Sequence, residues 1–195
     1  MSTVAMMERF AETSPRFKAR MAGALNLFSL LTAGVTETFV HGRLNFVGGY
    51  IAISSMVVVT LLLYGIFKPV SRGLSFLAAS FAFVGLVCEA LRLQPQGVNI
   101  AIVIHGFYCL LIGYLIVRSA FLPRILGALV AFAGLGWLTY LSPALVNYLS
   151  PYNLAAAILA ELSLMLWLLV MGVNVPHWME QSGAAVERRL AAHRA

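Results

Sequence analysis

The chain alternates between long runs of apolar residues and short polar segments. A helix that spans a bilayer needs about 17 to 25 mostly apolar residues, and we identify such runs at 21–40, 44–67, 73–91, 99–117, 125–141 and 153–173. All seven prolines lie at the ends of these runs or between them, where a missing N–H costs little. The short connections favour antiparallel neighbours. The pattern predicts an all-α, up-and-down bundle of six transmembrane helices.

Two more polar segments flank the predicted bundle. Residues 1–20 mix methionine and phenylalanine with basic residues, which is typical of an arm at the membrane surface. Residues 175–195 are expected to form a tail with a short surface helix, in which Trp178 lies at the level of the lipid headgroups. We therefore divide the chain into an N-terminal arm, a bundle over residues 21–174 and a C-terminal tail.

The composition agrees with a membrane protein. Hydrophobic residues make up 61% of the chain and charged residues only 10%, and the mean hydropathy is +0.90. The chain has no aspartate. Because a soluble domain of this length needs a charged surface, the composition excludes an ordinary soluble protein.

The basic residues are distributed unevenly between the two sides of the predicted bundle. Of the thirteen Lys and Arg residues, Arg43 and Arg92 lie on one side, and the others lie on the opposite side: Arg9, Arg16, Lys18, Arg20, Lys68, Arg72, Arg118, Arg124, Arg188, Arg189 and Arg194. The positive-inside rule then predicts that both termini are cytoplasmic. The net charge of +6 is explained by this topology and by contact with lipid headgroups, so no nucleic-acid partner is expected.

Small and polar residues recur at helical spacing along five of the runs. In lipid, helices associate through such residues, because apolar side chains gain nothing by leaving the lipid tails. We therefore expect five inward-facing stripes, which are Asn26, Ser29, Ala33, Thr36, Glu37 and His41; Asn45, Gly48, Gly49 and Ala52; Ser75, Ala78, Ala82, Gly85 and Glu89; Ala101, His105, Tyr108 and Cys109; and Asn153, Ala157 and Glu161.

The ionisable side chains on these stripes lie in one half of the predicted bundle. Glu37 and Glu89 come at the outer ends of their runs. At about 1.5 Å per residue, His105 lies about 9 Å and Glu161 about 12 Å below the outer surface. This placement predicts a cavity that opens to the extracytoplasmic side.

Glu161 and His105 are the candidate catalytic residues. A charge at this depth costs about 2.5–3.5 kcal/mol, so we expect Glu161 to be neutral or paired with His105. Such a pair suits general acid–base chemistry or the binding of a polar head group. Further candidate ligand-binding residues are Glu37, Glu89, Tyr108 and Asn153. The alternative for a polar residue near a helix end is that it reaches the headgroups or bonds a neighbour.

Other chemistries find little support in the sequence. No H-E-x-x-H pair or its reverse is present, so no metal site is predicted. A haem would need two facing histidines, and the expected depths of His41 and His105 differ. Cys88 and Cys109 are expected to be free thiols that pack between helices. Four aromatic residues are expected to anchor the helices at the outer membrane interface, namely Trp137, Tyr140, Tyr148 and Tyr152.

Two stretches resemble a known family. GYLIVRSAFLPRILGALVAFAGLGWL (113–138) and AELSLMLWLLVMGVN (160–174) are similar to the bacterial multi-pass membrane family catalogued as domain of unknown function four-three-eight-six. The resemblance implies six helices in a bacterial inner membrane, and His105 matches a histidine often found in that family. It departs at the first connection, HGR, where family members have a longer loop, so it supports no role for His41. No catalytic residue is carried over.

Two functional hypotheses remain open. In the first, the protein binds a lipid-like molecule of isoprenoid or quinone type in an outward-facing pocket. This hypothesis includes the case in which the protein also transforms that molecule. In the second, it is a non-catalytic accessory or assembly subunit of a larger membrane complex. Membrane lipid is an expected partner in both. The sequence defines neither a cofactor nor the oligomeric state, and it leaves open whether the protein is an enzyme.

Overall fold

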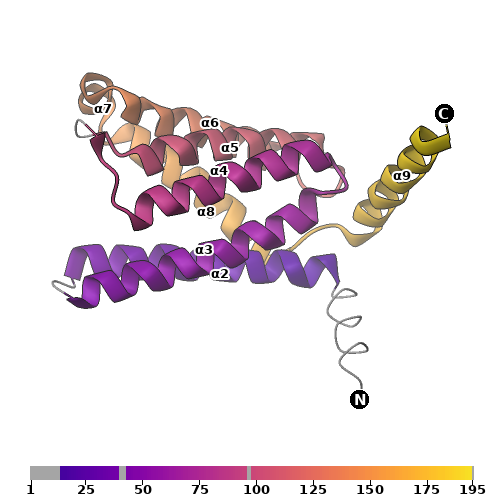
Figure 1. Ribbon diagram of the computed structural model, residues 1–195, viewed down its shortest axis with the longest axis horizontal. Helices are drawn as coiled ribbons and strands as arrows, with labels where there is room; N and C mark the ends of the chain where they lie inside the picture. The colour runs from indigo at the N-terminus through magenta and orange to yellow at the C-terminus, as the bar shows by residue number, and fades with distance from the viewer. Residues whose placement is uncertain (1–13, 40–42, 96–97, 195) are drawn as a thin grey trace, which may run out of the picture.

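The described part of the chain is almost entirely helical. The computed structural model describes residues 14–39, 43–95 and 98–194 (Figure 1). Over these residues it contains no β-strand, and its helices are α2 (Pro15–Phe39), α3 (Arg43–Phe67), α4 (Arg72–Ala90), α5 (Ile100–Arg118), α6 (Arg124–Leu138), the 3-10 helix η2 (Thr139–Leu141), α7 (Pro143–Leu149), α8 (Tyr152–Val170) and α9 (Val175–Arg194). The predicted all-α fold is confirmed.

Six of the described helices close a ring. Each packs against two neighbours in the order α2, α3, α4, α5, α6 and α8, and α8 packs back against α2. Because short connections join them, successive helices run up and down, as the pattern of apolar runs predicts. The helix α9 projects away from the ring (Figure 1). Its start is tied to α3, because the Trp178 indole donates a hydrogen bond to the Ile66 carbonyl at 2.9 Å.

Some helix boundaries differ from the expected runs. Helix α2 begins at Pro15, because the carbonyl of Ser14 accepts hydrogen bonds from the amides of Phe17 and Lys18 and so starts the helix within the basic segment. The fifth run forms α6 followed by η2. The connection after it contains a helix that the sequence did not predict, α7, which begins at Pro143 in the first helical position.

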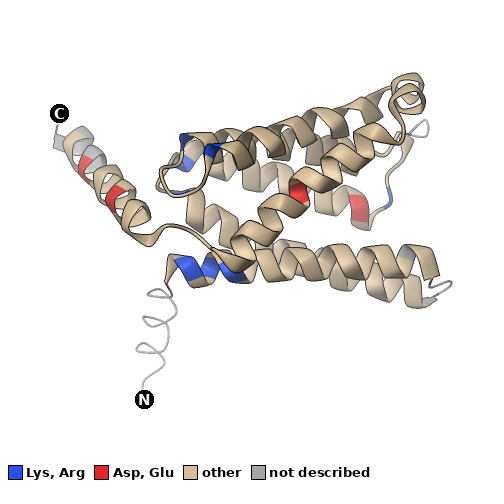
Figure 2. Cartoon of the chain, turned by 180° about the vertical axis from the view of Figure 1, so that it is seen from behind, with Lys and Arg blue, Asp and Glu red and all other residues tan. Residues whose placement is uncertain are grey.

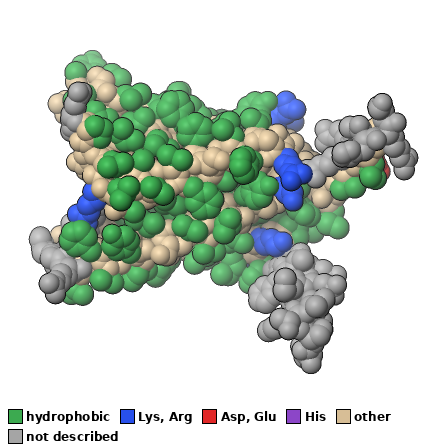
Figure 3. Space-filling view, in the orientation of Figure 1, with side chains coloured by type: hydrophobic (Ala, Val, Ile, Leu, Met, Phe, Trp, Pro, Cys, Tyr) green, Lys and Arg blue, Asp and Glu red, His purple; other side chains and the backbone are tan. Residues whose placement is uncertain are grey.

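Among the residues that the structure describes, five helices are long and apolar enough to cross a membrane. The segments are Leu44–Phe67, Arg72–Ala90, Ile100–Arg118, Arg124–Leu141 and Tyr152–Val170. Large hydrophobic side chains are exposed along them, and Figure 3 shows such side chains spread over the visible face. A water-facing surface of this kind would aggregate, whereas lipid covers it without cost. The structure therefore supports a multi-pass membrane protein.

Helix α2 is not among these five segments. Asn26, Ser29, Thr32 and Thr36 interrupt its apolar sequence. In the ring, however, Asn26, Ser29 and Thr36 line an internal cavity. The polar residues of α2 thus face inward, as its stripe predicts, while Leu31 and Val35 are exposed on its other side.

The described charges lie mainly at the ends of the ring. Figure 2 shows Lys and Arg residues at the end where α2 begins and α5 ends. Arg92 lies in the connection between α4 and α5, at the opposite end. We call the first the basic end. The arrangement matches the alternation of basic segments along the sequence.

Helices α5 and α6 approach each other through glycines. A Cβ atom on Gly113 would lie 2.6 Å from the Gly127 carbonyl oxygen, and one on Gly134 would lie 2.7 Å from the Gly106 carbonyl oxygen. Each helix carries two glycines seven residues apart, Gly106 and Gly113 on α5 and Gly127 and Gly134 on α6, and these let the two backbones touch over two turns. This contact fixes α5, the helix that carries His105.

Candidate functional site

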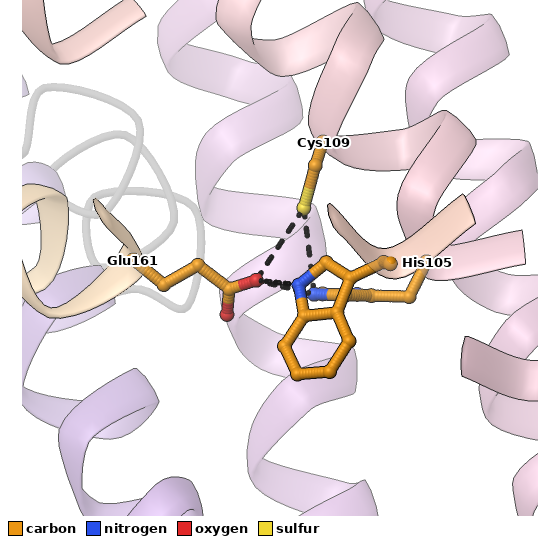
Figure 4. Close-up of polar contacts among 4 residues, drawn as sticks. His105, Cys109 and Glu161 are labelled. Atoms are coloured by element: carbon orange, nitrogen blue, oxygen red, sulfur yellow. Dashed lines mark hydrogen bonds and ion pairs between the residues drawn. The ribbon is translucent and has the colours of Figure 1, made fainter. Parts of the chain in front are cut away.

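The ring brings His105 of α5 and Glu161 of α8 together. Nε2 of His105 lies 3.1 Å from Oε1 of Glu161, within hydrogen-bond distance (Figure 4). His105 lies in the second turn of α5, whose start is capped by the Asn99 side chain accepting from the amide of Ile102. The expected proximity of His105 and Glu161 is confirmed, and so is the expectation that Glu161 has a partner.

Cys109 completes the cluster. It lies one turn after His105 on the same face of α5, and its Sγ atom is 3.4 Å from His105 Nε2 and 3.6 Å from Glu161 Oε1 (Figure 4). The sequence treatment of Cys109 as a packing thiol missed this contact. The i, i+4 spacing from His105 was the available signal, because such residues are neighbours on a helix surface.

Trp137 is also directed into the site. Its indole N–H donates a hydrogen bond to Oε1 of Glu161, and its ring lies 6.0 Å from the His105 ring in an edge-on arrangement. The expectation that Trp137 anchors the outer interface is therefore corrected. Trp137 lies in the last turn of α6, which ends one residue later and continues into η2.

His105, Trp137 and Glu161 of this cluster line a cavity of about 590 Å³. All six helices of the ring contribute to the wall. Of the predicted site residues, Glu89, His105, Tyr108 and Glu161 line it. Tyr108 is buried, with its ring 5.6 Å from that of His105. Much of the remaining wall is apolar, with residues such as Met56, Phe81, Leu86 and Met165.

The cavity reaches the surface at the end opposite the basic end. Its wall there includes Phe46, Tyr50 and Leu93, whose side chains are about half exposed. Arg92 lies over the Phe46 ring, 4.2 Å from its centroid, and donates a hydrogen bond to Oδ1 of Asn45 at 3.2 Å. We call this group the mouth of the cavity. It joins the end of α4 to the start of α3.

The backbone of Arg92 is unusual. Helix α4 ends with the amide of Leu93 bonded to the Cys88 carbonyl and the amide of Arg92 bonded to the Glu89 carbonyl, the pattern of a Schellman motif. Arg92 occupies the position that is usually glycine, with φ of 52°. A left-handed conformation costs a side-chain-bearing residue roughly 1–2 kcal/mol, so the contacts of Arg92 offset strain at the mouth.

The other predicted site residues are placed differently. Asn153 is buried, but it is not on the cavity wall. Its Nδ2 donates to the Thr139 hydroxyl at 2.9 Å and its Oδ1 accepts from the amide of Leu154, so Asn153 joins the start of α8 to η2. Glu89 is an exposed residue near the mouth. The side chain of Glu37 and all of His41 lie outside the described residues.

The geometry defines what the cluster can do. The imidazole of His105 and the carboxyl group of Glu161 line the cavity at one point, and the Cys109 thiol contacts both, so a molecule in the cavity would meet a proton donor and acceptor there. The same three groups are also common metal ligands.

Comparison with known proteins gives one family match. The model of the family described as domain of unknown function (DUF4386) matches residues 86–172. The resemblance expected from the sequence is thereby confirmed over this range, which contains His105, Cys109, Trp137 and Glu161. No curated protein and no solved structure matches the chain.

Proposed function

We propose that this protein binds an amphipathic, lipid-like molecule of isoprenoid or quinone type in the cavity, with the polar end of the molecule at His105 and Glu161. In this proposal all six ring helices cross a bacterial inner membrane, both termini are cytoplasmic and the mouth is extracytoplasmic. The observation that carries the proposal is the cavity itself, whose partly apolar wall carries the bonded pair of His105 and Glu161.

The size of the cavity supports a small-molecule ligand. Binding sites for small molecules usually measure about 300–1,000 Å³, and this cavity of about 590 Å³ lies within that range. An empty space of this size inside a helical ring forfeits packing contacts that neighbouring side chains could make. A ligand with an apolar body would restore these contacts.

Three hydroxyl groups on the cavity wall have partners within the protein, which favours the cluster as the place for the polar end of a ligand. The Ser29 hydroxyl donates to the Ala52 carbonyl at 3.0 Å, and the Thr36 and Thr60 hydroxyls donate to carbonyls of their own helices. These donors are already satisfied within the protein. The imidazole and carboxyl groups of His105 and Glu161 can exchange their mutual bond for bonds to a polar head group, at a depth where little water competes.

Native mass spectrometry after extraction in a mild detergent tests the proposal. The expected spectrum shows a bound molecule of lipid-like mass. Ala82→Leu extends a side chain from the cavity wall and should reduce the bound fraction several-fold, whereas Leu77→Ala, on the exposed side of the same helix, should leave it unchanged. Equal retention by both variants would place the molecule outside the cavity, and a companion subunit in place of a ligand would favour the accessory-subunit hypothesis.

The proposed orientation has its own test. In a protein with Cys88 and Cys109 replaced by serine, Gln94→Cys near the mouth and Lys68→Cys at the basic end introduce single exposed thiols. A membrane-impermeant maleimide added to spheroplasts should label position 94 and not position 68. Labelling of position 68 and not of position 94 would show that the topology is the reverse of the one proposed and that the mouth does not face the periplasm.

A further inference from the structure

The cluster at the base of the cavity has the composition of a metal site. His105, Cys109 and Glu161 each offer one ligand atom, and these atoms lie within 4.8 Å of one another. Two come from one face of α5 and the third from α8, so folding of the ring assembles the group. Figure 4 shows all three side chains pointing to the same place.

The distances within the cluster fit a tetrahedral ion. Zinc binds histidine nitrogen at about 2.0–2.1 Å, thiolate sulfur at about 2.3 Å and carboxylate oxygen at about 2.0–2.2 Å, which places the ligand atoms about 3.4 to 3.6 Å apart. The sulfur–nitrogen and sulfur–oxygen distances are 3.4 and 3.6 Å. The nitrogen–oxygen distance of 3.1 Å is that of a direct hydrogen bond, and an ion would open it by a few tenths of an ångström.

The charges also balance. A thiolate and a carboxylate carry one negative charge each, a neutral imidazole carries none, and a divalent cation brings the sum to zero. Net charge is costly at this depth in a membrane, so a neutral complex is favoured over any partly compensated arrangement of the same groups. The thiolate and imidazole ligands favour zinc over magnesium or calcium, which prefer oxygen.

We propose that His105, Cys109 and Glu161 bind one zinc ion, with its fourth position open to the cavity. The Trp137 N–H, which donates to Glu161, orients the carboxylate as outer-shell donors do in other metal sites. His105 and Glu161 line the cavity, so water or the polar group of a ligand can occupy the fourth position. Three protein ligands and one open position are characteristic of zinc ions that polarise a bound oxygen. This inference goes beyond ligand binding and does not require it.

Metal analysis of the purified protein tests the proposal. Protein prepared in detergent without chelators, supplied with zinc and desalted, should contain close to one zinc ion per chain by inductively coupled plasma mass spectrometry. Cys109→Ser should lower this content at least several-fold. Cys88→Ser is the matched control, since Cys88 is also a buried, free thiol beside the cavity, and it should keep the full content. Zinc that is absent, or retained equally by both variants, would overturn the proposal.

Cobalt substitution provides a readout on the unaltered chain, and so does not depend on the folding of a variant. Cobalt(II) bound by these ligands should give the intense visible bands of a tetrahedral ion and a near-ultraviolet thiolate-to-cobalt band. Added zinc should remove both. Weak octahedral bands without a thiolate transition would show that only a hydrogen-bonded cluster exists. Because no lipid-like ligand takes part, failure of the proposed ligand binding would leave this result unaffected.

Discussion

The two ends of the ring are built in opposite ways. At the basic end, Ile66, Phe67, Leu115 and Ile116 are almost completely buried and belong to one continuous core. At the other end, the helices surround a cavity of about 590 Å³, and the Glu161 side chain is 20% exposed. The same six helices form both ends. The difference therefore comes from the residues that each helix presents to the centre.

Large and small side chains are combined differently at the two ends. Glycines bring α5 and α6 into backbone contact towards both ends, but near the basic end branched or aromatic side chains fill the remaining space. Near the mouth, the facing stripes of α2, α3 and α4 consist mainly of small and polar residues, which leave the centre open. Dense packing gives stability, whereas the space left by small residues gives room for a ligand.

The largest expected effect is at the glycine contact of the packed region. Gly113→Leu drives a side chain into the backbone of α6, because even a Cβ atom would lie 2.6 Å from the Gly127 carbonyl oxygen. The cost should exceed the roughly 1–3 kcal/mol of ordinary overpacking and abolish the monodisperse peak in size-exclusion chromatography. Gly65→Leu is the control, since no atom of another helix lies within 4 Å of that Cβ position. If the two variants gave the same elution profile, the close contact between α5 and α6 would be refuted.

A second experiment compares truncations at the two ends. Leu115→Ala creates a void in a filled core and should lower the free energy of unfolding by about 2–5 kcal/mol. Leu86→Ala removes the same atoms from a side chain that already borders the cavity, so it should cost clearly less. Thermal denaturation in one detergent gives both values. Similar losses would mean that the cavity end is as tightly packed as the basic end.

A third experiment asks whether the polar cluster contributes function or stability. Glu161→Gln keeps the size of the side chain and can still accept the Trp137 N–H, but it removes the negative charge beside His105. We expect a melting temperature within a few degrees of the original, with loss of most of the bound ligand in native mass spectrometry. A large drop in melting temperature with full ligand retention would assign Glu161 a structural role.

The sequence predicted the architecture because bilayer thickness imposes long apolar runs whatever the tertiary packing. It also predicted the pairing of His105 with Glu161, because a deep ionisable group requires a partner. The roles of Cys109 and Trp137 were missed for a common reason. A lone cysteine has the pattern of a small apolar residue, and a tryptophan near the end of a run has the pattern of an interface anchor. For Cys109 the spacing from His105 was a signal that the sequence analysis did not use, whereas only the rotation of α6 about its axis shows that Trp137 points to Glu161.

Asn153 has a contact that helical spacing does not reveal. It shares a helix face with Glu161, and this spacing made it a candidate ligand-binding residue. In the structure its amide joins α8 to η2, and η2 was not predicted as a separate element. The short helix α7 was missed because a proline-containing connection between two runs carries no helical periodicity. Local capping and the paths of connections therefore limited the sequence prediction more than the long helices did.

The smallest expected effect is at the mouth, where two opposing contributions of Arg92 can be separated. Arg92→Ala removes the contact with the Phe46 ring and the bond to Asn45 but keeps a left-handed residue with a side chain, so we expect a loss of about 1 kcal/mol. Arg92→Gly removes the same contacts and also the backbone strain at φ of 52°, so its stability should lie close to that of the original chain. Thermal denaturation of the three proteins in one detergent measures the order. A glycine variant less stable than the alanine variant would show that Arg92 is not held in the left-handed region. The end of α4 would then not be fixed by a left-handed residue, and this difference between the mouth and the basic end would be lost.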